Sequence, residues 1–185
     1  MWAFLHKMAS PRYFYKIASS LVPWFLTSGL LLMVIGLING LFYAPPDYQQ
    51  GDAFRIIYVH VPAAYISMMA YSLMAFAAFV ALIWRIKIAH AVIVGAAPLG
   101  AWFTFLALLT GSIWGRPMWG TWWEWGDPRL TSELLMLFLY LGYMALRASI
   151  PNLAQADKLS AILILIGAIN IPIIHFSVEW WTSLH

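Results

Sequence analysis

Long apolar runs are the feature of this sequence that most restricts its fold. They cover residues 21–43, 62–84, 91–113, 129–147 and 160–177. Each run is long enough to cross the hydrocarbon core of a bilayer as a helix, which takes about 17–25 residues. Of the 185 residues, 63% are apolar and 9% are charged, whereas a soluble domain has about a quarter charged residues. We therefore predict an all-α fold, a polytopic bundle of five transmembrane helices that forms a single membrane domain over residues 1–185.

Prolines and one aspartate set the expected ends of these helices. Pro62 suits a first helical turn, where its missing N–H has no partner inside the helix, so the second span is expected to begin there. Pro98 is expected to kink or break the third span, and Pro172 to interrupt the fifth. Asp127 and Pro128 are expected to be an N-cap and a first-turn proline that open the fourth span.

Basic residues divide unevenly between the two sides of a five-span bundle. One side has Lys7, Arg12, Lys16, Arg85, Lys87, Arg147 and Lys158, and the other has Arg55, Arg116 and Arg129. The positive-inside rule therefore predicts a cytoplasmic N-terminus. The basic start resembles a signal peptide, but the apolar run exceeds an h-region of about 7–15 residues, so we expect a retained span. The segment 114–131, His60 and the C-terminal tail then share the outer surface.

Several classes of function find no support in the sequence. There are no cysteines, which excludes disulfides, thiolate metal sites and a cysteine nucleophile. The sequence has no basic block or motif for nucleic acid, no H-E-x-x-H zinc motif, and no Ser/His/Asp order that suggests catalysis. We therefore expect a protein that is not an enzyme, does not bind nucleic acid, and has the lipid bilayer as its main surroundings.

The segment 114–131 is rich in tryptophan. Its tryptophans are Trp114, Trp119, Trp122, Trp123 and Trp125. If the segment is helical, three of them (Trp119, Trp122 and Trp123) share one face, although Gly120, Gly126 and the prolines disfavour a long regular helix. An interfacial belt explains one or two tryptophans at a helix end, whereas a cluster of five suits a large flat apolar ligand or a membrane-surface helix. We expect a flat aromatic platform at the membrane surface, and composition leaves the ligand and the belt interpretations equally open.

Two of the five histidines, His60 and His185, lie on the outer side at or beyond the ends of predicted spans. A lone histidine in a loop is usually polar surface. A pair of them beside an aromatic segment suits axial ligation of haem iron by neutral imidazole. His6 and His90 are expected to be solvated on the cytoplasmic side, and His175 to line the bundle or hydrogen-bond a neighbour.

The outer arginines and Asp127 have simple structural roles and further candidate ones. Interfacial anchoring explains Arg55, Arg116 and Arg129. Arginine also binds carboxylates through a bidentate fork, so Arg55 and Arg129 are candidate partners for the two haem propionates. For Asp127 we expect helix capping in preference to contact with a ligand.

The motif W-G-T-W-W-E-W followed by D-P-R-L-T resembles the tryptophan-rich WWD signature of haem-handling proteins in cytochrome c biogenesis. The stretches D-Y-Q-Q-G-D-A-F-R-I-I-Y-V-H-V-P-A-A, T-G-S-I-W-G-R-P-M-W-G-T-W-W and N-I-P-I-I-H-F-S-V-E-W-W-T-S-L-H are similar to one group of that family. It is the haem exporter C group of the multi-component cytochrome c maturation system, and the similarity covers nearly the whole chain.

This resemblance implies a bacterial inner-membrane protein that binds haem b at its periplasmic face and presents it to a membrane-anchored periplasmic haem chaperone. The implied partners are this chaperone, a small single-span membrane protein, and the ATPase and membrane subunits of an ABC transporter. The implied axial ligands are His60 and His185, and not His175. The signature residues are Trp119, Gly120, Trp123, Trp125, Asp127 and Arg129.

Two features depart from the family pattern. Gly126 separates Trp125 from Asp127, where the family has no such residue. In a helix the extra residue rotates all later residues by about 100°, unless Gly126 absorbs it as a bulge. The family also usually has a sixth span, whereas five are predicted here.

Three other functions fit a helical membrane bundle. A cytochrome b-like electron carrier normally holds haem between histidines inside helices, which His60 and His185 near helix ends do not match. A channel needs polar residues along several spans, and few are present beyond Asn170 and scattered Ser and Thr. A structural membrane subunit anchored by its tryptophans is the third alternative.

Overall fold

The structure, a computed structural model, describes residues 10–181 of the chain, and within that range it contains helices and no strand. The elements are α2 (Pro11–Ile38), the π-helical η1 (Asn39–Tyr43), the 3₁₀-helical η2 (Asp52–Ile56), α3 (Ile57–Trp84), α4 (Lys87–Trp119), α5 (Pro128–Ser149), α6 (Leu153–Gly167) and α7 (Asn170–Trp180). Five stretches are long and apolar enough to cross a membrane: Pro11–Tyr43, Asp52–Trp84, Lys87–Trp119, Pro128–Ser149 and Leu153–Trp180. The predicted all-α membrane fold with five spans is confirmed.

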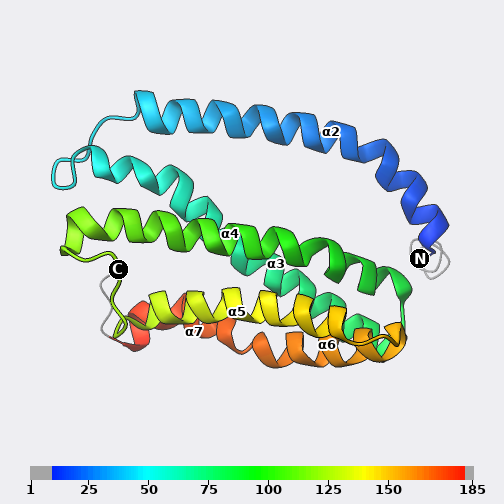
Figure 1. Cartoon of the computed structure of the whole chain (residues 1–185). Coiled ribbons are helices and arrows are strands. Elements are labelled where there is room, and N and C mark those ends of the chain that lie inside the picture. The colour runs from blue at the N-terminus through cyan, green and yellow to red at the C-terminus, as the bar shows by residue number, and fades with distance from the viewer. Residues whose placement is uncertain (1–9, 182–185) are drawn as a thin grey trace.

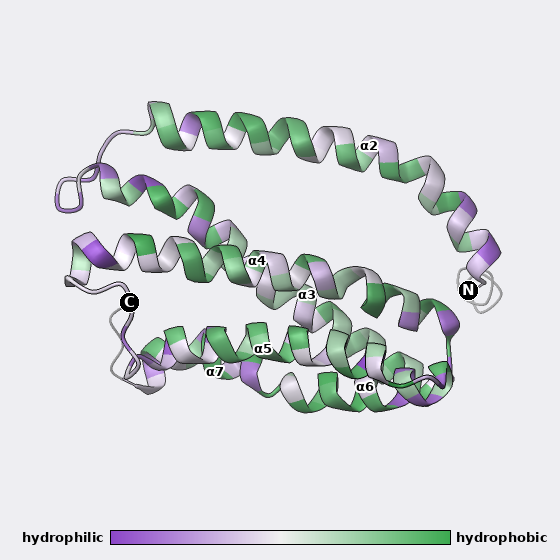
Figure 2. Cartoon of the chain, viewed as in Figure 1, coloured by the Kyte–Doolittle hydropathy of each residue, from purple (hydrophilic) through white to green (hydrophobic). Residues whose placement is uncertain are grey.

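Helices α3 to α7 pack side by side, and α2 lies apart from them (Figure 1). The turns that join α3 to α4 and α5 to α6 lie at the same end of the bundle as the start of α2. The loop after α2, the tryptophan-rich segment and the end of α7 lie at the opposite end. Figure 2 shows hydrophilic residues gathered near both ends of the bundle, with largely apolar helices between them.

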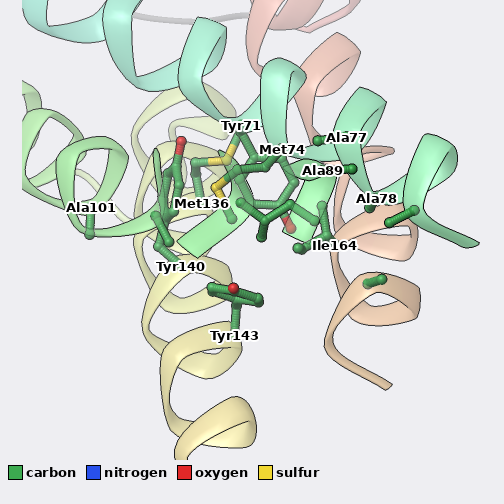
Figure 3. Packing of buried hydrophobic residues seen from close by; sticks show 14 of the residues in the cluster. Tyr71, Met74, Ala77, Ala78, Ala89, Ala101, Met136, Tyr140, Tyr143 and Ile164 are labelled. Atoms are coloured by element: carbon green, nitrogen blue, oxygen red, sulfur yellow. The ribbon is translucent and has the colours of Figure 1, made fainter. Parts of the chain in front are cut away.

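The core of the bundle is built from three tyrosines, Tyr71, Tyr140 and Tyr143, and small or flexible apolar side chains (Figure 3). Tyr71 of α3 and Tyr140 of α5 are fully buried, and their rings meet edge to face with centroids 5.0 Å apart. Gly100 of α4 lies directly against the Tyr140 ring, and Gly167 of α6 lies against Tyr71. Small residues at such contacts let membrane helices approach closely, which is how they gain packing energy where lipid competes.

Buried polar groups connect the helices across this core. The Ser67 hydroxyl donates a hydrogen bond of 2.8 Å to Oε1 of Glu133, and the Tyr140 hydroxyl donates one of 2.7 Å to the carbonyl of Ser67. The Asn170 amide donates a bond of 2.8 Å to the carbonyl of Ser132. In a lipid environment these groups have no water as a partner. The bonds therefore fix the register of α3 and α7 against α5.

Helix α2 has no buried residue. Its polar Thr27 and Ser28 hydroxyls donate to carbonyls of the preceding turn of the same helix, at 2.7 Å each. The chain is tied to the bundle just after α2, where Gly40 packs against the Tyr58 ring and Arg55 Nη1 donates to the carbonyl of Leu41 at 3.3 Å. Lipid is therefore the solvent for most of α2.

Two of the three prolines act differently from what their positions suggested. α3 begins at Ile57, directly after the turn of η2, so Pro62 lies inside the helix and costs it one backbone hydrogen bond. α4 runs without a break through Pro98, and the expected break there is wrong. Neighbouring helices stabilise such prolines in membrane bundles. The fifth span is interrupted at 168–169, just before Pro172, so the interruption expected there is confirmed.

Substitution of Gly100 tests the close contact between α4 and α5. A Cβ atom at Gly100 collides with the Tyr140 ring, whereas one at Gly95 meets no atom within 4 Å. We expect Gly100→Ala to destabilise the protein by about 1–3 kcal/mol through overpacking. Gly95→Ala is the matched control, expected to be neutral or stabilising by up to about 1 kcal/mol because alanine favours a helix. Denaturation of the purified protein in detergent measures both changes, and equal effects contradict this packing account.

Candidate functional site

His60 lies in the first turns of α3, with its ring against α4. Its Nδ1 is 3.0 Å from the carbonyl oxygen of Ala107 and 3.1 Å from Oγ1 of Thr110. The ring also packs on Gly111, where a Cβ would lie 3.0 Å from Cε1. Since a carbonyl only accepts hydrogen bonds, Nδ1 carries the proton and the lone pair lies on Nε2. A backbone carbonyl holding one nitrogen in this way is the usual arrangement of a histidine that ligates a metal through the other.

A pocket of about 370 Å³ opens beside His60 at the end of the bundle where α4 ends and α5 begins. Its walls come from η2, α3, α4, α5 and α7, and they include Gln50, His60, Trp114, Arg129 and His175. The remaining lining is mainly apolar. Pockets for small molecules measure about 300–1,000 Å³ and combine apolar walls with a few polar groups, which describes this one.

Trp114 and Trp119 stand at the end of α4 next to this pocket. The Trp114 Nε1–H donates a hydrogen bond of 3.0 Å to Oε1 of Gln50, so the loop after α2 positions this indole. Trp119 meets Trp114 edge to face, with ring centroids 5.0 Å apart and planes at 77°. Trp114 lines the pocket itself.

Trp122, Trp123 and Trp125 lie in the loop after α4. The helix ends at Trp119, and Gly120 caps it with a φ of 79°, a left-handed conformation that glycine adopts without steric cost. The helix does not continue through Trp122 and Trp123, as the glycines indicated, so the condition for a helical face shared with Trp119 is not met. Trp123 and Trp125 meet at 66°, so the rings do not form one flat platform. Trp122 and Trp125 are 57% and 73% exposed.

Gly126 and Asp127 end this loop in a turn. The Asp127 N–H donates to the carbonyl of Glu124 at 3.2 Å, so Gly126 occupies a turn position between them. The extra residue is thus absorbed before the helix begins, and it does not rotate α5. Asp127 is 3% exposed, and its Oδ1 accepts hydrogen bonds from the N–H groups of Arg129 and Leu130 at 2.9 and 3.0 Å. The expected N-cap is confirmed.

The three arginines at this end of the bundle have different surroundings. Arg129, in the first turn of α5, lines the pocket with His60. Arg55 instead contacts the Leu41 carbonyl and lies 3.4 Å from Asp52, and it is not part of the pocket lining. Arg116 donates to the carbonyl of Gly120 at the end of α4. The structure therefore brings His60, Trp114 and Arg129 together and leaves Arg55 at the side of the loop after α2.

Three residues near the pocket were not assigned to the site from the sequence. His175 of α7 and Gln50 line the pocket with His60. Glu133 of α5 is 7% exposed. It lines a small cavity of about 50 Å³ together with His60 and Arg129, which also line the larger pocket. An acidic residue inside a membrane span is itself an indication of function. This was the signal in the sequence that could have identified Glu133. His185 lies outside the described residues.

No group of three or more His, Asp or Glu side chains within residues 10–181 is placed to hold a metal ion by itself. The site as described instead offers one imidazole with a defined tautomer, a second imidazole, a guanidinium, and the indole of Trp114 with Trp119 against it. This set suits a large aromatic ligand that carries carboxylates and a metal ion to which an imidazole nitrogen can bind.

Comparison with known proteins agrees with the sequence resemblance. The model of the family described as Heme exporter protein C matches residues 4–185. A protein of that name from Escherichia coli K12 is 51% identical over 185 residues, covering 100% of this chain and 75% of the relative. Those of Haemophilus influenzae and Bradyrhizobium diazoefficiens are 52% identical (100% and 75% covered) and 48% identical (96% and 67% covered). This chain therefore belongs to the Heme exporter protein C family.

Proposed function

We propose that this protein binds haem b at the pocket beside His60 and delivers it to a haem chaperone for cytochrome c maturation. The name of its relatives indicates haem as the cargo. The observation that carries the proposal is the His60 geometry: the Ala107 carbonyl holds Nδ1–H, and the lone pair remains on Nε2 beside an apolar pocket. Imidazole in this state is a common axial ligand of haem iron.

The other walls of the pocket fit the rest of a haem. Trp114 supplies an aromatic face next to His60, and Arg129 supplies a guanidinium suited to a propionate. Arg55 is proposed as the second propionate partner, reached after it leaves the Leu41 carbonyl. Asp127 supports the site by capping α5, which orients the backbone that carries Arg129.

The pocket volume of about 370 Å³ is near the lower end of the range for small-molecule sites. A large ligand seated there therefore keeps one edge outside, towards the loop of Trp122, Trp123 and Trp125, in which Trp122 and Trp125 are exposed. We propose that these indoles cover the exposed edge together with Trp119. An open edge favours release to a receiving protein, so the activity is binding and transfer without a catalytic step.

The proposed axial ligands are His60 and His185. His175 is the competing second imidazole because it lines the same pocket. Ligation by His60 and His175, both within helices, is the pattern of a cytochrome b-like electron carrier, which is the second candidate function.

Histidine substitutions distinguish these ligand sets. We expect His60→Ala and His185→Ala each to weaken haem retention by about 10–100-fold or more. Changing a residue that only hydrogen-bonds a metal ligand already costs about that much. His175→Ala is expected to keep the Soret band and the two-histidine spectrum. His90→Ala, at the opposite end of the bundle, is the matched control. The measurement is a haem titration of the purified protein followed by absorption.

A Soret band that is unchanged in both His60→Ala and His185→Ala contradicts the ligand assignment. If His175→Ala loses the absorption spectrum of haem ligated by two histidines and His185→Ala keeps it, the result favours a cytochrome b-like electron carrier. A protein that takes up no haem at all favours a structural subunit.

We further propose that the protein lies in the bacterial inner membrane with its N-terminus in the cytoplasm and the pocket at the periplasmic face. The basic residues support this orientation, since Arg85, Lys87, Arg147 and Lys158 lie at or near the turns opposite the pocket. The proposed partners are the membrane-anchored periplasmic chaperone, a small single-span protein, and the ATPase and membrane subunits of an ABC transporter.

Reporter fusions test this orientation. An alkaline phosphatase domain fused after Trp125 should be active, because that enzyme folds only in an oxidising compartment outside the cytoplasm. The same domain fused after Asn152, in the turn between α5 and α6, should be inactive. The reverse pattern contradicts the proposed orientation.

A further inference from the structure

A second and larger pocket, of about 920 Å³, lies at the end of the bundle opposite His60. It is formed where the turn between α3 and α4 meets the start of α6. Figure 1 shows both segments at the same end of the bundle. Arg85, Lys87 and Lys158 line it, together with apolar residues that include Leu82 and Leu153. The proposed haem function does not use this pocket.

The charges of this pocket are unbalanced. Its one acid, Asp157, accepts a hydrogen bond of 2.9 Å from Nε of Arg147, and its other oxygen lies 4.0 Å from Nδ1 of His90. Among residues 10–181, Arg85, Lys87 and Lys158 form no ion pair within 4.0 Å. The pocket therefore presents three cations that form no ion pair with an acid of the described chain, and its single acid is already paired with Arg147, so the pocket attracts an anion.

The backbone around the pocket adds to this attraction. Lys87 lies in the first turn of α4 and Leu153 in the first turn of α6, so two helix N-termini contribute to the lining. Helix N-termini favour negative charge, above all phosphate. Arg85 holds a left-handed conformation with φ of 54°, which is uncommon for a residue with a side chain and ends α3 next to the pocket.

The position of the pocket defines the source of the anion. It lies at the ends of membrane-spanning helices, next to Trp84, which is 59% exposed and of the residue type that marks the headgroup level. Its wall includes Leu153, whose side chain is 60% exposed. A phosphate attached to acyl chains contacts both the cations and this apolar surface, whereas a free phosphate contacts only the cations.

We propose that this pocket binds the phosphate headgroup of an anionic phospholipid, with Arg85, Lys87 and Lys158 around the phosphate and the acyl chains along the apolar wall. Basic pockets between membrane helices are known to bind such headgroups. The proposal is independent of haem, so it stands or falls separately from the function proposed above.

The test uses the purified full chain in detergent, with phosphatidylglycerol as the probe and phosphatidylcholine as its zwitterionic counterpart. Native mass spectrometry measures the lipid retained by the wild type and by Lys87→Gln/Lys158→Gln, whose two side chains are exposed and tolerate substitution. The matched control is Arg12→Gln/Lys16→Gln, which removes two exposed cations from α2 at the same end of the protein.

We expect the wild type to retain phosphatidylglycerol in preference to phosphatidylcholine. The Lys87/Lys158 variant should bind it about 30-fold more weakly, from about 1 kcal/mol for each cation near an anionic surface. The α2 control should match the wild type. Inorganic phosphate at millimolar concentration should not displace the lipid.

Three results overturn the proposal. Equal retention of the two lipids by the wild type removes the headgroup preference. An equal loss in the α2 control shows a general effect of surface charge. Displacement of phosphatidylglycerol by inorganic phosphate identifies a soluble phosphate site in place of a lipid site. Should the double variant fold poorly, Lys158→Gln alone, on the exposed side of α6, gives the same comparison with about a fivefold expected loss.

Discussion

The packing of α3 against α4 is the contact on which the rest of the structure depends. The two helices are joined by only two residues, so they must run antiparallel along their full length. Small residues allow a close approach: Ala77 of α3 and Ala97 of α4 are buried in the core, and Gly111 of α4 packs on the His60 ring. This approach holds the His60 ring against the Ala107 carbonyl at one end of the pair. It also brings Arg85 and Lys87 together at the other end.

The buried polar groups give this apolar bundle a unique arrangement. Van der Waals packing between apolar helices in lipid tolerates rotation or sliding, because lipid chains are as apolar as the side chains they replace. Glu133, Ser67 and Tyr140 remove that freedom, since each has its hydrogen-bond partner in only one register. The position of α5 is thereby fixed relative to α3. Because Arg129 lies one turn before Glu133 on α5, the same register sets the wall of the pocket.

Much of the fold was predictable from the sequence, and parts of the site were not. Hydropathy identified all five spans because span length is set by the bilayer. The Asp127 cap was also predictable, since an N-cap depends on adjacent residues alone. The effects of Pro62 and Pro98 depend on neighbouring helices that local patterns do not describe. The pocket position of His175 depends likewise on how α7 packs, and the indole angles depend on the turn at Gly120.

The isolation of α2 has a thermodynamic consequence. None of its residues is buried, so a sideways or tilting displacement of this helix within the lipid exposes almost no core surface. The main resistance comes from the connection around Gly40 and Leu41, where the chain returns to the bundle. In energetic terms, residues 10–181 form a cooperative unit of the four later spans and an outlying first span that inserts largely by itself. The stability of α2 in the membrane is therefore governed by lipid composition and thickness, and that of the remaining spans by their mutual fit.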